Sequence, residues 1–116
     1  MRNIKKYWPA VIIAIIAIFV VALIVAKRPT AMTLFYGETC PHCQIVEEYL
    51  TANQVRARVQ FQEREVYNNP ANAQELTRRA RQCGLDITQG VGVPFFFDGK
   101  NCLVGDQEII NFFKDK

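Results

Sequence analysis

Four cysteines and a single histidine are the residues of this chain best suited to redox or metal chemistry. Two of the cysteines, Cys40 and Cys43, are separated by Pro41 and His42. Because proline favours the first position of a helix, this spacing predicts a helix that begins at Pro41 with Cys40 as its N-cap. At that position free backbone N–H groups and the positive end of the helix dipole stabilise a thiolate, which makes Cys40 a candidate nucleophile.

The second cysteine makes the pair suited to thiol–disulfide exchange. Cys43 lies about one helical turn further on, where its thiol is placed to attack a mixed disulfide on Cys40 and release the partner. This chemistry needs one accessible thiol, Cys40, and one shielded thiol, Cys43. His42, when it is protonated or donates a hydrogen bond, would stabilise the Cys40 thiolate further.

The spacing of Cys40 and Cys43 alone leaves two other interpretations of the pair open. One is half of a zinc or iron–sulfur site, which needs further close ligands. Cys83 and Cys102, however, are nineteen residues apart on different expected elements. The other is a pair of inert core thiols, although a helix N-terminus is not where a core thiol usually lies. We favour the redox interpretation and predict no metal site.

The elements around the cysteine pair follow from the apolar pattern. Residues 33–36 predict a buried strand that ends at Gly37, and the helix from Pro41 is expected to reach about Ala52. Residues 59–67 alternate as a strand with one wet face. The apolar face of the first helix is expected to hold Ile45, Val46, Tyr49 and Leu50.

A second helix is predicted after residue 69. Asn69 and Pro70 are an N-cap and a first-turn residue, and Gly84 ends the helix. Its buried face is expected to hold Ala73, Leu76, Ala80 and Cys83, and its solvated face Arg78, Arg79 and Arg81.

The chain then predicts a hairpin and a last helix. Residues 93–97 and 100–104 are strands joined by a two-residue Asp98-Gly99 turn, which would place Cys102 opposite Phe95. Asp106 is the expected N-cap of the last helix. The resulting order, β-α-β-α-β-β-α, predicts an α/β fold with a parallel pair of strands followed by an antiparallel hairpin.

Residues 32–116 in this order resemble a glutaredoxin-like member of the thioredoxin superfamily. The resemblance rests on the strand 33–36, the Cys40-Pro41-His42-Cys43 turn, the Val93-Pro94 dipeptide and the Val104-Gly105-Asp106 stretch. It implies a four-stranded mixed sheet with helices on both faces. It also implies that Pro94 follows a cis peptide bond facing the disulfide, and that Val93 offers backbone hydrogen bonds to the substrate. Gly105 and Asp106 are carried over as further substrate-binding residues.

Two departures from the family pattern bear on function. Typical glutaredoxins have Cys-Pro-Tyr-Cys and a basic residue shortly before it, whereas this chain has His42 and, upstream, Gly37 and Glu38. The Pro-His dipeptide is similar to that of the periplasmic disulfide oxidases. We therefore expect a thiol–disulfide oxidoreductase without a resident cofactor, acting on protein thiols and disulfides. The alternatives are a cytoplasmic glutaredoxin that uses glutathione as co-substrate, or a metal-binding module.

The N-terminal part is long and apolar enough to cross a membrane. Residues 10–26 are seventeen consecutive apolar residues, and the segment from Tyr7 to Ala26 would form a helix of roughly 30 Å. Pro9 suits a first helical turn. The predicted domains are a basic flank (1–8), a transmembrane helix (9–26), a linker (27–32) and the redox domain (33–116). A cleaved signal peptide and a buried core helix are the alternatives.

The charge distribution excludes one class of partner and indicates an orientation. The net charge is +3, but residues 1–28 hold five basic and no acidic side chains, while residues 29–116 hold nine basic and eleven acidic ones. A basic excess beside an apolar segment does not indicate a nucleic-acid partner. The positive-inside rule favours a cytoplasmic N-terminus and an extracytoplasmic domain, and the short linker favours a redox partner in the membrane.

The remaining cysteines have two possible states. In an oxidising compartment Cys83 and Cys102 can form a structural disulfide, and otherwise each is a free, buried thiol. The sequence leaves both states open.

Overall fold

The elements of the fold follow the predicted order with one addition. The structure, a computed structural model, describes residues 3–26 and 31–116. The addition is α3, a single helical turn before the second strand. In chain order the elements are α1 (Ile4–Ala26), β1 (Thr33–Tyr36), α2 (Pro41–Ala52), α3 (Val55–Arg58), β2 (Gln62–Glu65), α4 (Pro70–Gln82), β3 (Phe95–Phe97), β4 (Cys102–Val104) and α5 (Asp106–Lys114).

Helix α1 is longer than predicted. It begins at Ile4, where Asn3 C=O already accepts a hydrogen bond from the Lys6 N–H at 3.1 Å. The prediction that Pro9 lies in the first helical turn is therefore wrong, and part of the expected basic flank is helical. Among the described residues α1 is the one helix long and apolar enough to cross a membrane, by length and composition alone. Of the predicted linker, residues 27–30 lie outside the described residues.

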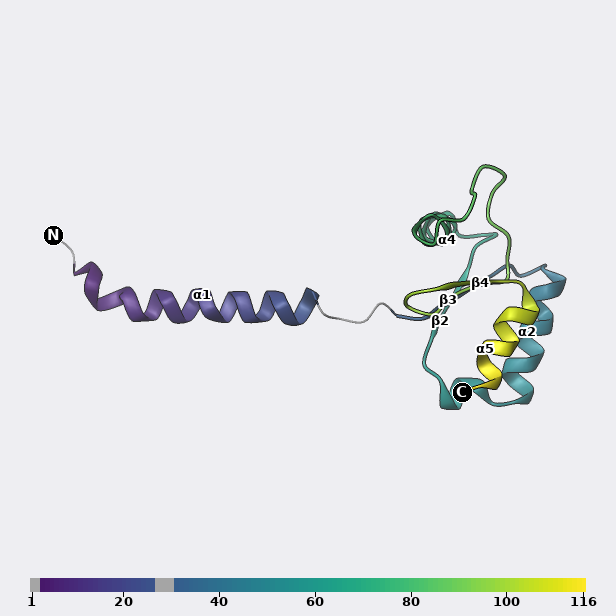
Figure 1. Ribbon diagram of the computed structural model, residues 1–116, viewed down its shortest axis with the longest axis horizontal. Helices are drawn as coiled ribbons and strands as arrows, with labels where there is room; N and C mark the ends of the chain where they lie inside the picture. The colour runs from purple at the N-terminus through teal and green to yellow at the C-terminus, as the bar shows by residue number, and fades with distance from the viewer. Residues whose placement is uncertain (1–2, 27–30) are drawn as a thin grey trace.

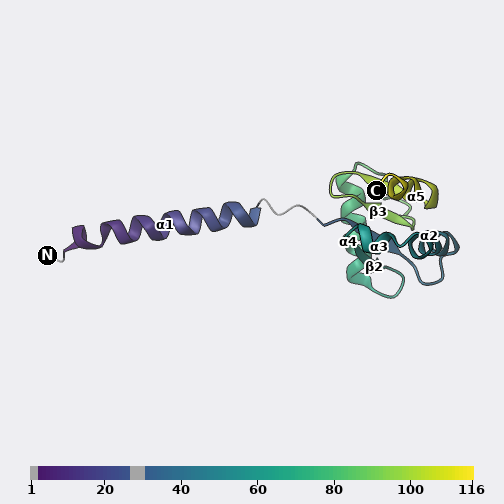
Figure 2. The same cartoon turned by 90° about the horizontal axis from the view of Figure 1, so that it is seen from below.

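The sheet is mixed and has four strands in the order β2-β1-β3-β4. Strand β1 pairs in parallel with β2 and antiparallel with β3, and β3 pairs antiparallel with β4. Figures 1 and 2 show α2 and α5 side by side on one face of this sheet and α4 on the other. The parallel pair, the hairpin and the two-sided covering are as predicted.

Alternation along the central strands divides the core into two layers. Leu34 of β1 and Phe96 of β3 face α2 and α5, whereas Phe35 and its neighbours Phe95 and Phe97 face α4. Both layers are dry: Phe35, Phe95 and Phe96 are fully buried. Burying three whole phenylalanine side chains contributes several kcal/mol in total. The central strands are therefore the rigid support on which the loops at their ends are held.

Three predicted strands are shorter than expected, among them β4, which covers 102–104 instead of 100–104. Strand β2 covers 62–65 instead of 59–67, because α3 ends only at residue 58 and the Val59 N–H still donates to Val55 C=O. Strand β3 begins at Phe95 instead of Val93, since Pro94 has no N–H to donate to a neighbouring strand.

The hairpin register differs from the prediction by two residues. Cys102 pairs with Phe97 and not with Phe95. The reason is the Asp98 carboxylate, which accepts hydrogen bonds from the backbone N–H groups of Lys100 and Asn101 at 2.8 and 2.5 Å. Asp98 therefore stands before the turn, where an aspartate commonly bonds to the backbone that follows it, and not at its centre.

Three smaller predictions are also wrong. Asp106 is not the N-cap of α5: Gly105 is, and Asp106 is the first helical residue. Ile45 is 42% exposed, because Cys43, Val46 and Leu50 set the buried face of α2. Arg79 does not lie on a solvated face, since its guanidinium carbon is 4.7 Å from the centroid of the Phe97 ring.

A second disulfide joins the two remaining cysteines. Cys83, the C-cap of α4, is bonded to Cys102 at the start of β4, with Cα atoms 6.1 Å apart. Both residues pack against the core layer under α4. Of the two states left open by the sequence, the structure has the bridge, and it ties the far end of α4 to the edge of the sheet.

We expect this bridge to stabilise the domain. Replacing Cys83 and Cys102 together by serine should lower the free energy of unfolding by about 3 kcal/mol, because the bridge closes a loop of about twenty residues. Urea denaturation measures the loss, and the Cys40→Ser/Cys43→Ser protein is the matched control with a much shorter loop. When the Cys40→Ser/Cys43→Ser protein is denatured without reduction, it should show no reactive thiol. Two reactive thiols would contradict the Cys83–Cys102 bridge.

Candidate active site

The N-terminus of α2 is built around the cysteine pair, as the sequence predicts. Cys40 is the N-cap in an extended conformation, and Pro41 is the first helical residue. The Cys43 N–H donates a hydrogen bond to Cys40 Sγ at 3.1 Å. The two side chains form a disulfide, with Cα atoms 5.2 Å apart. The Cys40 sulfur therefore lies at the positive end of α2, where reduction yields a stabilised thiolate.

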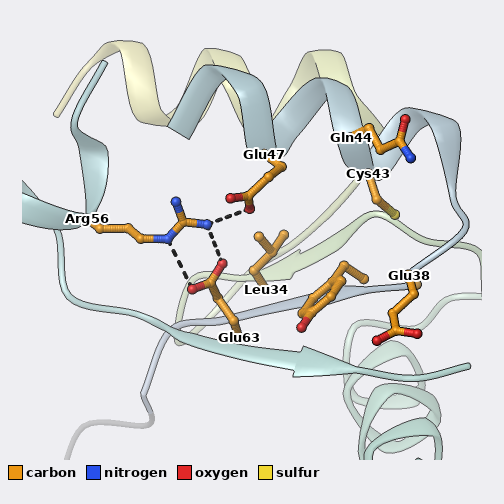
Figure 3. A pocket seen from close by; sticks show the side chains of 9 residues that line it. Leu34, Glu38, Cys43, Gln44, Glu47, Arg56 and Glu63 are labelled. Atoms are coloured by element: carbon orange, nitrogen blue, oxygen red, sulfur yellow. Dashed lines mark hydrogen bonds and ion pairs between the residues drawn. The ribbon is translucent and has the colours of Figure 1, made fainter. Parts of the chain in front are cut away.

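Exposure does not distinguish the two cysteines. In the disulfide form Cys40 is 5% exposed and Cys43 is 6% exposed, and the prediction of one accessible and one shielded residue stays a prediction for the reduced thiols. Cys43 also lines an open groove between α2 and the β1–β2 edge of the sheet (Figure 3). The hydrogen bond to its sulfur, and not its exposure, is what sets Cys40 apart.

This groove is acidic and has a volume of about 460 Å³. Arg56 closes one end by pairing with Glu47 and Glu63, at 2.5 and 2.6 Å (Figure 3). Burial raises the pKa of Tyr36 above its usual range, and the surrounding carboxylates, Glu63 first among them, raise it further. The lining residues are Leu34, Tyr36, Gly37, Glu38, Cys43, Gln44, Glu47, Arg56 and Glu63.

The residues placed by the resemblance meet at the disulfide. The Val93–Pro94 peptide bond is cis, as predicted. Val93 O lies 3.6 Å from Cys40 Sγ, within reach of an S–H donor when Cys40 is a reduced thiol. The Gly105 N–H donates to Pro94 O at 3.0 Å, which ties the start of α5 to the same loop. Val93 therefore lies at the Cys40 sulfur, and Gly105 is joined to the same loop through Pro94.

His42 and Asp106 form a pair that the sequence did not indicate. His42 Nδ1 is 3.5 Å from Asp106 Oδ2, with the histidine side chain 70% exposed and the aspartate side chain 18% exposed. The position of His42 predicts a role beside the thiolate, and the family resemblance implies a role for Asp106 in binding the substrate. In the structure each faces the other across the gap between α2 and α5.

The described residues offer no cluster of metal ligands. In the ranges 3–26 and 31–116, no three His, Cys, Asp or Glu side chains are arranged to hold a metal ion. Both cysteine pairs are engaged in disulfides.

Comparison with known families identifies the domain. The glutaredoxin family model matches residues 29–100, which is more than half of the chain. The chain belongs to the glutaredoxin family. It is a thiol–disulfide oxidoreductase with a thioredoxin-like fold, and proteins bearing thiols or disulfides are its substrate class. A comparison with curated protein sequences gives no match.

The glutaredoxin domain holds its active-site loop against a turn that sequence reasoning missed, residues 65–68. The Glu65 carboxylate accepts hydrogen bonds from the Glu38 N–H at 3.0 Å and the Asn68 N–H at 2.6 Å. Asn68 Nδ2 in turn donates to Glu38 Oε2 at 3.0 Å. Gly37 is buried against the Tyr67 ring, and a Cβ atom at this position would clash with the ring unless the Tyr67 side chain moved. The presence of Gly37 is a weak signal of a close contact, but it does not indicate the partner.

The Glu65 contacts make the loop sensitive to acid. The hydrogen bond from the Asn68 N–H, together with those from Glu38 and Tyr67, lowers the pKa of Glu65 below its ordinary value of 4.5. A carboxyl group whose pKa is depressed by folding stabilises the fold above the unfolded-state value, and this contribution is lost as the pH falls through the folded-state value.

We therefore expect Glu65→Gln to act on stability in a pH-dependent way. At pH 7 the variant should be less stable than the parent, because an amide accepts these hydrogen bonds less strongly than a carboxylate. The difference should shrink as the pH falls below about 4.5, where the parent carboxylate becomes protonated. Urea midpoints measured from pH 7 to pH 3 test this, with Glu48→Gln, at an exposed position of α2, as the control. If the difference in stability between parent and variant does not change with pH, the Glu65 carboxylate does not hold the backbone of Glu38 and Asn68 in the way described.

Proposed function

We propose that this glutaredoxin-family protein is a membrane-anchored enzyme that exchanges disulfides with proteins outside the cytoplasm through Cys40 and Cys43, without a resident cofactor. The observation that carries the proposal is the Cys43 N–H hydrogen bond to Cys40 Sγ at the N-terminus of α2. It favours Cys40 as the sulfur that joins the substrate, because this sulfur is the one stabilised as a thiolate.

The exchange proceeds in two steps. In the oxidising direction a substrate thiolate attacks Cys40 Sγ, the Cys40–Cys43 bond breaks, and Cys43 leaves as a thiolate that takes up a proton. A second thiolate of the substrate then attacks the substrate sulfur of the mixed disulfide. A disulfide forms within the substrate, and Cys40 leaves as the stabilised thiolate. The substrate loses two electrons and the enzyme gains them. The reverse sequence reduces a substrate disulfide, so the redox partner decides the net direction.

The groups near the disulfide favour proteins over glutathione as substrate. Glutathione carries a net negative charge at neutral pH, and the loop before Cys40 presents Glu38 where glutathione-dependent relatives have a basic residue. The carboxylate of Asp106, which faces His42, is a second acidic group that disfavours a negatively charged co-substrate. Membership of the glutaredoxin family favours the alternative, a glutathione-dependent enzyme on the cytoplasmic side.

The length of α1 and the second disulfide support an anchored, extracytoplasmic domain. Helix α1 has 23 residues and the composition of a membrane span. The Cys83–Cys102 bridge suits an oxidising compartment. The three Lys or Arg residues before the apolar segment outnumber the two after it, which favours a cytoplasmic N-terminus. The linker predicted from the sequence, residues 27–32, is short and would keep the domain close to the bilayer. This suits a redox partner that is itself a membrane protein.

Trapping of mixed disulfides tests the roles of the two cysteines. Cys43→Ser should accumulate mixed disulfides with protein substrates, because the bond to Cys40 then has no intramolecular competitor. Cys40→Ser should trap few or none. The species are resolved by non-reducing electrophoresis after acid quenching, with reduced samples as controls. Equal trapping by the two variants would show that the roles are assigned wrongly.

The orientation of the domain is tested by reporters fused after Lys116. A phosphatase that is active only outside the cytoplasm should be active in the fusion, and a reporter that is active only in the cytoplasm should be silent. Replacing the basic residues before the apolar segment (Arg2, Lys5 and Lys6) by Gln should weaken the preference for an extracytoplasmic domain. The opposite pattern in the parent chain would favour the cytoplasmic alternative.

A further inference from the structure

We propose that Asp106 is a positioning residue for His42, and that through this pair it sets how strongly His42 stabilises the Cys40 thiolate. The proposal rests on the proposed dithiol chemistry of Cys40 and Cys43. It assigns Asp106 a part in the redox step, in addition to the place at the substrate site that the family resemblance gave it.

The start of α5 leaves the Asp106 carboxylate free to act across the gap to α2. Gly105, with φ of 93°, is the N-cap and has no side chain to cap the helix. Glu108, the other acidic residue of the first turn, is engaged elsewhere, since its Oε2 accepts a hydrogen bond from the Val104 N–H at 3.2 Å. Asp106 is the first helical residue, and its Oδ2 faces His42 Nδ1 at 3.5 Å.

The burial of the two partners is unequal, so the Asp106 carboxylate is the more constrained of the two. The Asp106 side chain is 18% exposed and sits at the start of a helix packed against α2, whereas the His42 ring is 70% exposed. A long-lived orientation of an exposed ring needs a fixed partner, and the carboxylate supplies one. It favours the ring orientation in which Nδ1 faces α5, and it stabilises the positive charge of the protonated ring.

The position of His42 connects this pair to the sulfur chemistry. His42 is the second residue of α2, next to Cys43, whose N–H donates to Cys40 Sγ. A positive charge held at this end of the helix adds to the helix dipole and favours the thiolate over the disulfide. Asp106 is itself negative, so its direct effect on the sulfur has the opposite sign. Only an effect transmitted through His42 makes the disulfide more oxidising.

A double-mutant cycle separates the two effects. The full chain in detergent micelles is equilibrated with glutathione buffers near pH 6.5, and alkylated Cys40 is quantified by mass spectrometry. We expect Asp106→Ala to shift the equilibrium constant about threefold toward the disulfide when His42 is present, in the range of a partly exposed ion pair. In the His42→Phe background the same substitution should not shift it in this direction. Glu108→Gln, which removes an equal charge from the same helical turn and keeps an oxygen to accept the Val104 N–H, is the matched control and should leave the constant unchanged.

A spectroscopic measurement reports the pair directly. His42 is the only histidine of the chain, so its ring nitrogens give one unambiguous set of ¹⁵N resonances. In the neutral ring we expect the proton on Nδ1, and we expect Asp106→Ala to abolish this preference. The dispersion of the backbone amide signals in the same sample shows that the variant is folded.

The outcomes separate this proposal from the proposed function. Two results for the equilibrium constant would overturn the pairing role: an Asp106→Ala shift that is equal with His42 and with Phe at this position, or a shift toward the thiols. A ring tautomer that is unchanged by Asp106→Ala would also overturn it. Loss of mixed-disulfide trapping by Cys43→Ser in the same preparations would instead refute the proposed function. Trapping that persists while Asp106→Ala has no effect refutes the pair alone.

Discussion

The hydrogen bond from the Cys43 N–H to the Cys40 sulfur is the contact around which the active site is arranged. It exists because Pro41 starts a helix immediately after Cys40 and because α2 is anchored by Val46 and Leu50 in the core. The helix end is thereby held rigidly at the point where β1 ends. A sulfur in this place is stabilised as a thiolate by the peptide backbone and the helix dipole.

The other parts of the site are brought to this sulfur by the sheet. Strand β3 leads from Val93 and Pro94, and the Val93 carbonyl oxygen lies 3.6 Å from Cys40 Sγ. Strand β4 ends at Gly105, whose N–H bonds to Pro94 O, and α5 then presents Asp106 to His42. On the opposite side Glu65 at the end of β2 holds the Glu38 backbone. The loops at the ends of all four strands are therefore tied, directly or through a neighbour, to the segment that holds this sulfur, and the two core layers fix the relative positions of the strands.

The sequence predicts the local features of this arrangement and misses most of the contacts between distant segments. The N-cap at Cys40 and the cap at Asn69 depend on neighbouring residues, and both are confirmed. The cis bond before Pro94 follows from the family resemblance and is also present. The hairpin register was missed because the same Asp-Gly dipeptide fits two positions in a turn, and only the hydrogen bonds of Asp98 decide between them. The His42–Asp106 pair and the Glu65 clamp have no local signal, since their partners meet only when the sheet has formed.

The central claim, that the N-terminus of α2 stabilises a Cys40 thiolate, is tested most directly by the equilibrium reduction potential of the Cys40–Cys43 disulfide. The full chain is equilibrated in redox buffers at neutral pH, quenched and alkylated. Peptide mass spectrometry then separates this pair from Cys83–Cys102. A stabilised thiolate favours the reduced form, so we predict a potential less negative than about −200 mV, the upper end of ordinary glutaredoxins. A potential more negative than about −230 mV would contradict the account.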